Sequence, residues 1–123
     1  MINLVAIAAG GAIGALLRHG VNHFSAGASF PWGTMVVNIG GSLAMGLLIG
    51  MFALFLDVPP VLRAFMTVGL LGAFTTFSTF SMDAILLLEK GRFLEGTFYI
   101  LGSVGLSLLA MVLGLIIARM IPL

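Results

Sequence analysis

Eight consecutive residues inside a hydrophobic segment, 74–81, combine five hydroxyl groups with three phenylalanine rings. Gly69 and Gly72 precede them, and glycine weakens a helix. One or two hydroxyls can remain in a membrane helix by bonding to a carbonyl one turn earlier. Five hydroxyls beside glycine and β-branched threonine indicate a helix that breaks at membrane depth. Because irregular backbone is tolerated there only in a protein interior or a wet cavity, this segment is predicted to be a permeation or binding element.

Two phenylalanines of this segment are candidates for contact with an anion. Phe77 and Phe80 are three residues apart and share a helix face, while Ser78 and Ser81 share the adjacent face. Phenylalanine in a membrane helix ordinarily contacts lipid, but here hydroxyls alternate with the rings, and Thr79 adds another. The edge of an aromatic ring is electropositive, so ring edges can approach an anion that a carboxylate would repel.

Polar side chains also occur inside the second and fourth hydrophobic segments. Asn38 lies well inside the second one, and its amide has four hydrogen-bonding positions to satisfy in hydrocarbon. It either joins two helices or donates to a pathway, and both interpretations remain open. Tyr99, Ser103 and Ser107 are spaced by four in the fourth segment, so one helix face presents three hydroxyls. This spacing predicts a track of hydrogen-bond donors that faces the third segment.

Arg18 stands near the end of the first hydrophobic segment, where a charge inside the bilayer would cost at least about 2.5–3.5 kcal/mol. Two interpretations remain open for it: an arginine that extends from the helix end to the headgroups, or an electropositive vestibule that attracts anions. His19 and His23 are four residues apart but have no third ligand nearby in the sequence. We therefore interpret the two histidines as interfacial residues rather than as a metal site.

The positions of the carboxylates argue against coupled export of cations. The first and second segments contain no Asp or Glu, and Asp83, at the end of the third, is the most deeply placed carboxylate. Proton-coupled export of cations normally needs a carboxylate inside the membrane. Hydroxyls, an amide, ring edges and an arginine suit an anion better. Fluoride is favoured among halides where close hydrogen-bond donors must replace a tightly held hydration shell.

The whole chain has the composition of a membrane protein. Of its 123 residues, 61% are hydrophobic and 7% are charged, and its mean hydropathy is +1.27. A soluble domain of this size needs roughly a quarter of its residues charged, so lipid must be the solvent of this chain. The absence of cysteine excludes disulfides and thiolate metal sites, and a formal charge of +1 offers no basic patch for nucleic acid.

Uncharged stretches predict an all-α integral membrane protein with four transmembrane helices, the third broken near its middle. Each stretch can supply the roughly 20 largely apolar residues that a span needs. The expected spans, within a single domain that covers 1–123, are approximately 2–23, 32–56, 62–88 and 95–121. Four spans are too few to enclose a pathway alone, so self-association is expected. The small residues Gly10 and Gly14 suit close helix approach, either within one chain or between two chains.

The distribution of Lys and Arg leaves the orientation in the membrane undetermined. With four spans, two basic residues lie on one side and three on the other, which is almost no bias for the positive-inside rule. This balance is compatible with a chain that inserts both ways and forms an antiparallel, dual-topology homodimer. A single orientation set by weak cues is the alternative. The residues are Arg63 and Arg119 on one side and Arg18, Lys90 and Arg92 on the other.

Three motifs of the chain resemble the Fluc (CrcB) family of prokaryotic fluoride channels. They are Gly10–Arg18 (GGAIGALLR), Pro31–Asn38 (PWGTMVVN) and Gly72–Ser81 (GAFTTFSTFS). These motifs fall in three of the four expected spans, and the length and four-span layout fit the family over the whole chain. The fourth span matches more loosely, through its tyrosine and two serines.

The resemblance implies a dual-topology homodimer with two antiparallel fluoride pores in the cytoplasmic (inner) membrane of a prokaryote. It implies that Phe77 and Phe80 line the pore, with Asn38 as their polar companion. It also implies a structural sodium ion at the dimer interface, bound by the backbone carbonyls of Gly72 and Thr75 from both subunits. The hydroxyls to which it gives lining or supporting roles belong to Ser78, Thr79, Tyr99, Ser103 and Ser107. The Ser81 hydroxyl, on the same segment as the two phenylalanines, is also expected to meet the anion.

A passive channel that exports fluoride, and so protects the cell from fluoride that enters as HF, is the favoured hypothesis. The alternative is a small dimeric multidrug exporter with four helices, which the absence of a carboxylate in the first span disfavours. A third hypothesis is a membrane subunit that transports nothing by itself. An enzyme is not expected, because no set of nucleophile, base and orienting group can be assembled.

Overall fold

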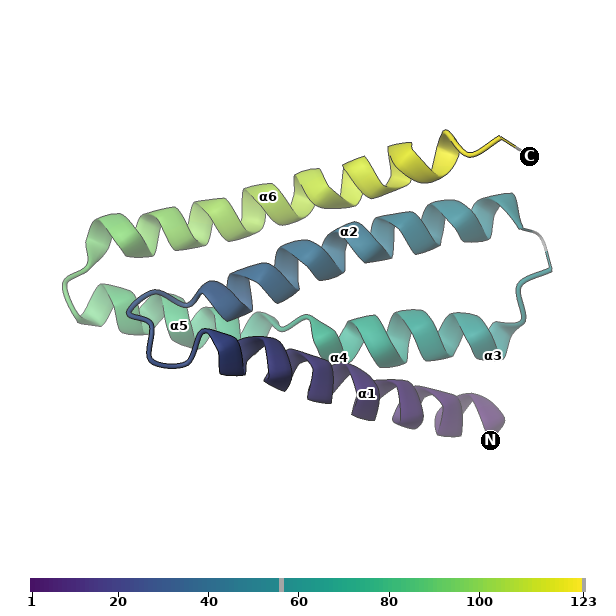
Figure 1. Cartoon of the computed structure of the whole chain (residues 1–123), viewed down its shortest axis with the longest axis horizontal. Coiled ribbons are helices and arrows are strands. Elements are labelled where there is room, and N and C mark those ends of the chain that lie inside the picture. Colours follow the sequence, from purple (N-terminus) through teal and green to yellow (C-terminus); the bar gives the residue numbers. More distant parts are fainter. Residues whose placement is uncertain (56, 123) are drawn as a thin grey trace.

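The computed structural model describes residues 1–55 and 57–122, and every regular element within them is a helix (Figure 1). The elements are α1 (Ile2–Phe24), α2 (Trp32–Leu54), α3 (Pro60–Arg63), η1 (Ala64–Leu71), α4 (Gly72–Phe74), α5 (Phe77–Glu89) and α6 (Phe93–Arg119). Element η1 is a π-helix, and the others are α-helices.

Four stretches are long and apolar enough to cross a membrane: Ile2–Phe24, Trp32–Leu54, Pro60–Glu89 and Phe93–Arg119. The prediction of an all-helical chain with four membrane spans is therefore confirmed. The second span was expected to reach residue 56, which lies outside the described residues. Helix α2 ends at Leu54, and Phe55 has extended backbone angles.

Helices α2 and α6 lie side by side along most of their length and run in the same direction (Figure 1). Their contact depends on glycine. A methyl group added to Gly46 would overlap the Met111 carbonyl, and one added to Gly114 would come within 2.5 Å of the Leu43 carbonyl. Because the absent side chains let the two backbones approach, small residues determine this seam.

A second glycine seam joins α1 to the first part of the third span. Gly10 lies against the backbone of Phe65 and Leu70, and Gly14 lies against the Leu70 carbonyl. Helix α1 and η1 run in the same direction in Figure 1. The spacing of Gly10 and Gly14 in the sequence thus marks an intramolecular contact in this chain, which is one of the two alternatives that the sequence left open.

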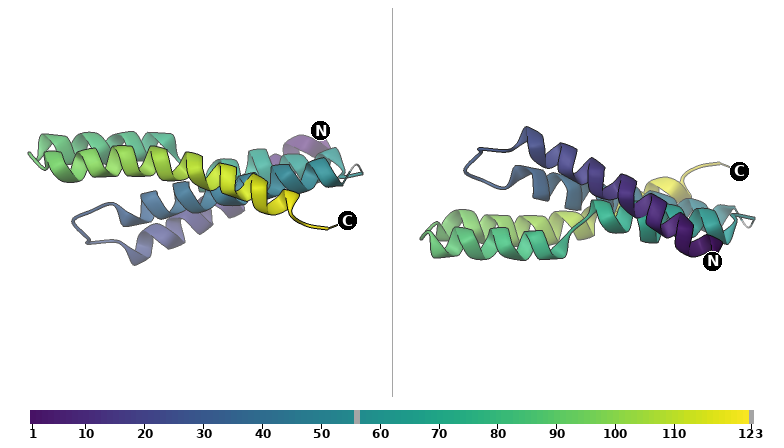
Figure 2. Two further views of the ribbon diagram at one scale, coloured as in Figure 1. Left: turned by 90° about the horizontal axis from the view of Figure 1, so that it is seen from above. Right: turned by 90° about the horizontal axis from the view of Figure 1, so that it is seen from below.

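At one end of the molecule, the turn between α5 and α6 contacts the turn between α1 and α2. Gly91 has a φ of 76°, in the left-handed region that favours glycine, and it lets α5 turn into α6. Arg92, which follows, contacts the carbonyl oxygen of Ser29 in the α1–α2 turn and also the carboxylate of Glu95. In the two views of Figure 2, α5 lies beside the first part of α6, and the α1–α2 turn lies to one side of both.

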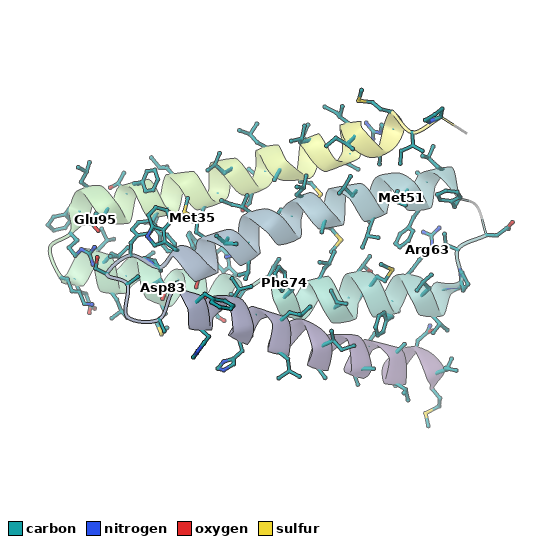
Figure 3. The ribbon with its side chains drawn as sticks, in the orientation of Figure 1. Met35, Met51, Arg63, Phe74, Asp83 and Glu95 are labelled. Carbon is teal, nitrogen blue, oxygen red and sulfur yellow. The ribbon has the colours of Figure 1, made fainter. Side chains whose placement is uncertain are left out.

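The hydrophobic core sits near this same end, where α5, the start of α2 and the first turns of α6 meet. Figure 3 places Met35, Asp83 and Glu95 in this region, Phe74 near the middle of the molecule, and Met51 and Arg63 toward the opposite end. Much of the remaining apolar surface is exposed, as expected for helices that are solvated by lipid. The buried core residues are Phe30, Met35, Phe80, Ala84, Leu87 and Tyr99.

Candidate functional site

Two residues in the third membrane-spanning stretch have extended rather than helical backbone. Thr75 has φ −86° and ψ 156°, and Thr76 has φ −152° and ψ 121°. They lie between α4 and α5, in the hydroxyl-rich segment 74–81, and Figure 1 shows this connection near the middle of the molecule. Extended residues at membrane depth leave backbone polar groups without helical partners, so other groups must satisfy them.

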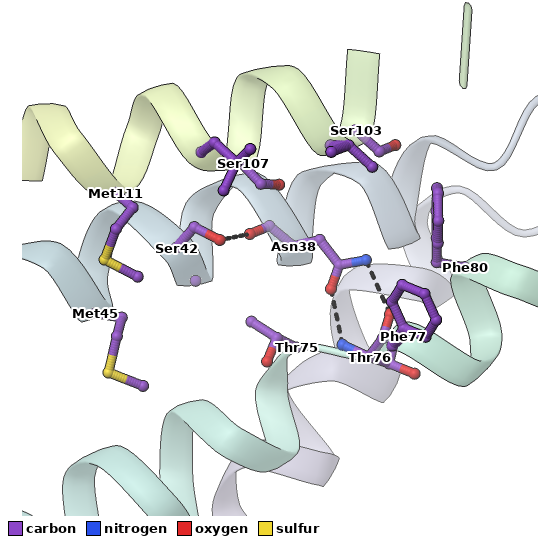
Figure 4. A pocket seen from close by; sticks show the side chains of 13 residues that line it. Asn38, Ser42, Met45, Thr75, Thr76, Phe77, Phe80, Ser103, Ser107 and Met111 are labelled. Atoms are coloured by element: carbon purple, nitrogen blue, oxygen red, sulfur yellow. Dashed lines mark hydrogen bonds between the residues drawn. The ribbon is translucent and has the colours of Figure 1, made fainter. Parts of the chain in front are cut away.

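The side chain of Asn38 satisfies both backbone groups of Thr76. Its Nδ2 donates to the Thr76 carbonyl oxygen at 3.0 Å, and its Oδ1 accepts from the Thr76 N–H at 2.7 Å (Figure 4). The Thr76 hydroxyl in turn accepts from the Thr79 N–H at 3.2 Å and so caps α5. An asparagine on α2 and a threonine cap thus hold the connection between α4 and α5.

These hydrogen bonds remove the usual donors from two carbonyl groups. In a continuous α-helix the Thr76 N–H would bond the Gly72 carbonyl, and the Thr79 N–H would bond the Thr75 carbonyl. Here the first donates to Asn38 and the second to the Thr76 hydroxyl. The carbonyls of Gly72 and Thr75, which sequence resemblance implicated in binding sodium, therefore lack their helical donors.

A cavity of about 340 Å³ lies between α2, the connection at Thr75 and Thr76, α5 and α6. Its lining is mainly apolar and includes the thioethers of Met45 and Met111 (Figure 4). Charged side chains do not appear among the described residues that line it. The polar side chains of the lining are Asn38, Ser42, Thr75, Thr76, Ser103 and Ser107.

The two phenylalanines that were predicted to share a face both line this cavity. Their ring centroids are 5.7 Å apart, and the rings are tilted by 48°. Phe80 is almost completely buried, with 8% of its surface exposed, whereas Phe77 is 78% exposed. Phe80 also packs against Tyr99 at 5.2 Å between ring centroids. One ring is therefore fixed by the core, and the other extends from the surface of the single chain.

The two serines of α6 differ from the other hydroxyls of the cavity in having no hydrogen-bond partner. The hydroxyl oxygens of Ser103 and Ser107 are buried, and no described residue bonds to either of them. By contrast, the Ser42 hydroxyl donates to the Asn38 backbone carbonyl at 2.7 Å, one turn earlier in α2. Leaving a buried polar group unpaired costs about 1–3 kcal/mol. The two free hydroxyls are therefore the groups of the cavity that gain most from a hydrogen bond to a polar ligand.

The remaining predicted site residues lie outside the cavity lining. The Tyr99 hydroxyl donates to Asp83 Oδ2 at 3.1 Å, beyond Phe80. The Ser78 hydroxyl lies 3.4 Å from the Thr76 hydroxyl, and the Ser81 hydroxyl donates to the Phe77 carbonyl at 2.9 Å. Thr79, through its N–H, belongs to the cap of α5, and Arg18 lies on α1. The structure thus brings Asn38, Phe77, Phe80, Ser103 and Ser107 together at the cavity.

Sequence reasoning missed several lining residues. Ser42 lies one turn after Asn38 on the same face of α2, so its spacing could have identified it. Thr76 lay within the segment 74–81 that was predicted to be a permeation or binding element, but its role as the N-cap of α5 was not predicted, although a threonine directly before the first helical residue is a signal for it. Met45 and Met111 carry no such signal, because methionine is ordinary in an apolar helix.

In the described part of the chain, no three His, Cys, Asp or Glu residues gather to bind a metal ion.

Four helices long and apolar enough to cross a membrane define a small multi-pass membrane protein, and three of the four spans line a cavity with hydroxyl, amide and phenylalanine groups. The family model described as "CrcB-like protein, Camphor Resistance (CrcB)" matches residues 5–115. The chain belongs to this family, and the resemblance seen in its three motifs is confirmed.

Three known proteins similar to this chain share one name. The "Fluoride-specific ion channel FluC" of Methylobacterium nodulans is 54% identical over 106 residues, which cover 85% of this chain and 86% of the relative. Proteins of the same name from Methylobacterium sp. (strain 4-46) and Agrobacterium fabrum are 44% and 46% identical, and each covers 97% of this chain and 98% of the relative. These relatives give no support to the alternative of a multidrug exporter.

Proposed function

We propose that this chain is a fluoride-selective ion channel of the bacterial membrane. The observation that carries the proposal is the cavity in which the unpartnered hydroxyls of Ser103 and Ser107 lie with the rings of Phe77 and Phe80. The names of the similar proteins supply the ion. Passive conduction needs no coupling carboxylate, and the cavity lining contains none among its described residues.

The lining chemistry suits a small, strongly hydrated anion. Fluoride gives up bound water only where close donors replace it. The hydroxyls of Ser103 and Ser107 are free to donate, and Asn38 Nδ2 has a second hydrogen beyond the one that it gives to Thr76. The rings of Phe77 and Phe80 also line the cavity, and an anion can approach their electropositive edges favourably. The negative interior of the cell then drives the anion outward.

The proposed channel is an antiparallel homodimer whose chains insert in both orientations. The nearly equal numbers of Lys and Arg on the two sides of the membrane support this arrangement. The exposure of Phe77 beside the cavity supports it as well, because a second copy of the chain would cover this ring. A partner would also close a pathway that four helices leave open.

A sodium ion between the two chains would be held by the backbone carbonyls of Gly72 and Thr75. The residues fit such an ion, since both carbonyls have lost their helical N–H donors to other hydrogen bonds. Carbonyl oxygens are suitable ligands for an alkali cation. Its positive charge would compensate the dipoles of the Gly72 and Thr75 carbonyls, which lack helical donors because Thr75 and Thr76 are extended.

Fluoride efflux from liposomes tests the proposal. The purified chain is reconstituted into vesicles loaded with potassium fluoride, and efflux is started with valinomycin and followed with a fluoride electrode. We expect rapid efflux of fluoride and none of chloride from matched vesicles. The absence of fluoride efflux, or chloride efflux of similar size, would contradict the proposal. Saturable, pH-dependent transport of a lipophilic cation would instead revive the exporter.

A further inference from the structure

The position of Asn38 suggests a role in addition to contact with a transported ion. Its amide group is paired on both sides with one residue, because Nδ2 donates to the Thr76 carbonyl at 3.0 Å and Oδ1 accepts from the Thr76 N–H at 2.7 Å. Only a planar group that carries a donor and an acceptor side by side can make this pair. The pair joins α2 to the third span, between residues 38 positions apart in the sequence.

The same pair determines where helix α5 begins. Because the Thr76 N–H bonds Asn38, it is withdrawn from the Gly72 carbonyl, and α4 ends at Phe74. The Thr76 hydroxyl then caps α5 through the Thr79 N–H, so the helix starts at Phe77. A shift of this start by one residue would turn every side chain of α5 by about 100° around the helix axis.

We propose that Asn38 is a positioning residue that fixes the extended backbone of Thr75 and Thr76. Through this backbone it orients Phe77 and Phe80 toward the cavity and releases the Gly72 carbonyl from helical bonding. The proposal rests on the proposed function only where ion flux is the readout. Hydrogen–deuterium exchange of the backbone tests the pairing itself, whatever the chain transports.

Substitutions at position 38 separate the two hydrogen bonds. Leucine in Asn38→Leu has a similar size but can neither donate nor accept. The carboxylate of Asn38→Asp accepts only and would face the Thr76 carbonyl oxygen, whereas its protonated form again has a donor and an acceptor. Burial favours protonation of a carboxyl group, so acidification within a range that leaves the parent intact should restore the pair.

The experiment measures amide exchange by mass spectrometry on the full chain in detergent micelles, in peptides that cover 75–79. We expect exchange in this segment to be about fivefold to tenfold faster in Asn38→Leu than in the parent, after correction for intrinsic rates. Asn38→Asp should exchange faster than the parent at about pH 7.5 and approach it at about pH 5. Fluoride efflux should follow the same pattern, compared with the parent and with empty vesicles at each pH.

Ser107→Ala is the matched comparison, because it alters a hydroxyl of the same cavity that bonds no described residue. We expect it to lower fluoride efflux and to leave exchange in 75–79 at the parent's rate. A residue that only contacts the ion would behave in this way.

Two results would overturn the proposal. One is a rate of amide exchange in 75–79 of Asn38→Leu that equals the parent's rate, even if the variant no longer transports fluoride. The other is fast exchange of Asn38→Asp that acidification does not slow, and this arm decides the matter if Asn38→Leu does not fold. If the parent conducts no fluoride, the proposed function fails, while the exchange measurements still decide the role of Asn38.

Discussion

Phe80 is the aromatic residue that the structure fixes most firmly at the cavity. Its ring is buried, packs against Tyr99 on one side, and lies 5.7 Å from the Phe77 ring on the other. Aromatic pairs with tilted rings direct an electropositive edge toward a neighbour, an arrangement worth about 0.5–1.5 kcal/mol beyond the burial of area. An aliphatic side chain of similar volume would preserve packing and remove this edge.

The substitution Phe80→Ile is therefore expected to lower fluoride efflux by about tenfold or more, which corresponds to about 1.4 kcal/mol of lost stabilisation along the pathway. The liposome assay measures the loss, and size-exclusion chromatography verifies that the assembly is unchanged. Phe24→Ile is the control, because Phe24 lies at the end of α1 with 91% of its surface exposed. Equal efflux from the two variants would remove Phe80 from the pathway.

At the scale of elements, glycine determines how closely the helices approach. Gly14 lies against the Leu70 carbonyl, and its missing side chain also leaves room for the Phe74 N–H, which a Cβ would approach to 3.1 Å. Gly20 lies on the same helix but has no atom within 4 Å of an added Cβ among the described residues. The seam between α1 and η1 holds the first half of the third span, and so the backbone that leads to Thr75.

Gly14→Ala should thus destabilise the fold by about 1–3 kcal/mol, because its methyl group must displace backbone rather than a flexible side chain. Gly20→Ala, the matched control, should be neutral or should stabilise the protein by up to about 1 kcal/mol through better helix propensity. Thermal unfolding in one detergent, followed by the loss of the monodisperse chromatographic peak, compares the two. A Gly14→Ala protein as stable as the control would show that this seam can relax.

The elements were largely accessible from the sequence, since hydrophobic length alone separates four spans. The arrangement at the third span was less so. The hydroxyl-rich segment marked the position of Thr75 and Thr76, but the partner of their backbone, Asn38, comes from another helix, and the sequence left its role open between two interpretations. The π-helix η1 that precedes them has no simple signal, because its residues AFMTVGLL would suit an α-helix equally well.

The cavity was predictable only in part, for a related reason. Spacing by three or four places Phe77 with Phe80, and Ser103 with Ser107, on common faces, because the helical repeat is local. Which faces then meet depends on the packing of distant helices. Tyr99 shares the spacing of the two serines, yet its hydroxyl bonds Asp83 rather than lining the cavity. Periodicity identified the track but not the point where it leaves the cavity.

At the scale of the whole molecule, the distribution of positive charge bears on how the chain is oriented in the membrane. Arg18 lies in the last part of α1, and Lys90 and Arg92 lie in the α5–α6 turn, whereas Arg63 ends α3 and Arg119 ends α6. Figure 1 shows that the α1–α2 and α5–α6 turns lie at one end of the molecule, and that the start of α3 and the end of α6 lie at the other. A difference of one charge gives the insertion machinery almost no preference. An antiparallel pair needs both orientations in about equal amounts, so the same near balance would supply both of its halves.

Labelling from one side of the membrane tests dual topology. The chain has no cysteine, so Ala26→Cys places a single thiol in the exposed α1–α2 turn. In intact cells a membrane-impermeant maleimide should label about half of the protein, and permeabilisation should expose the rest. Adding a positive charge to the same turn with Ala28→Lys should lower the externally labelled fraction, since that end would then be retained inside. Complete labelling, or none, in the cysteine variant alone would mean a single orientation and would rule out the antiparallel homodimer.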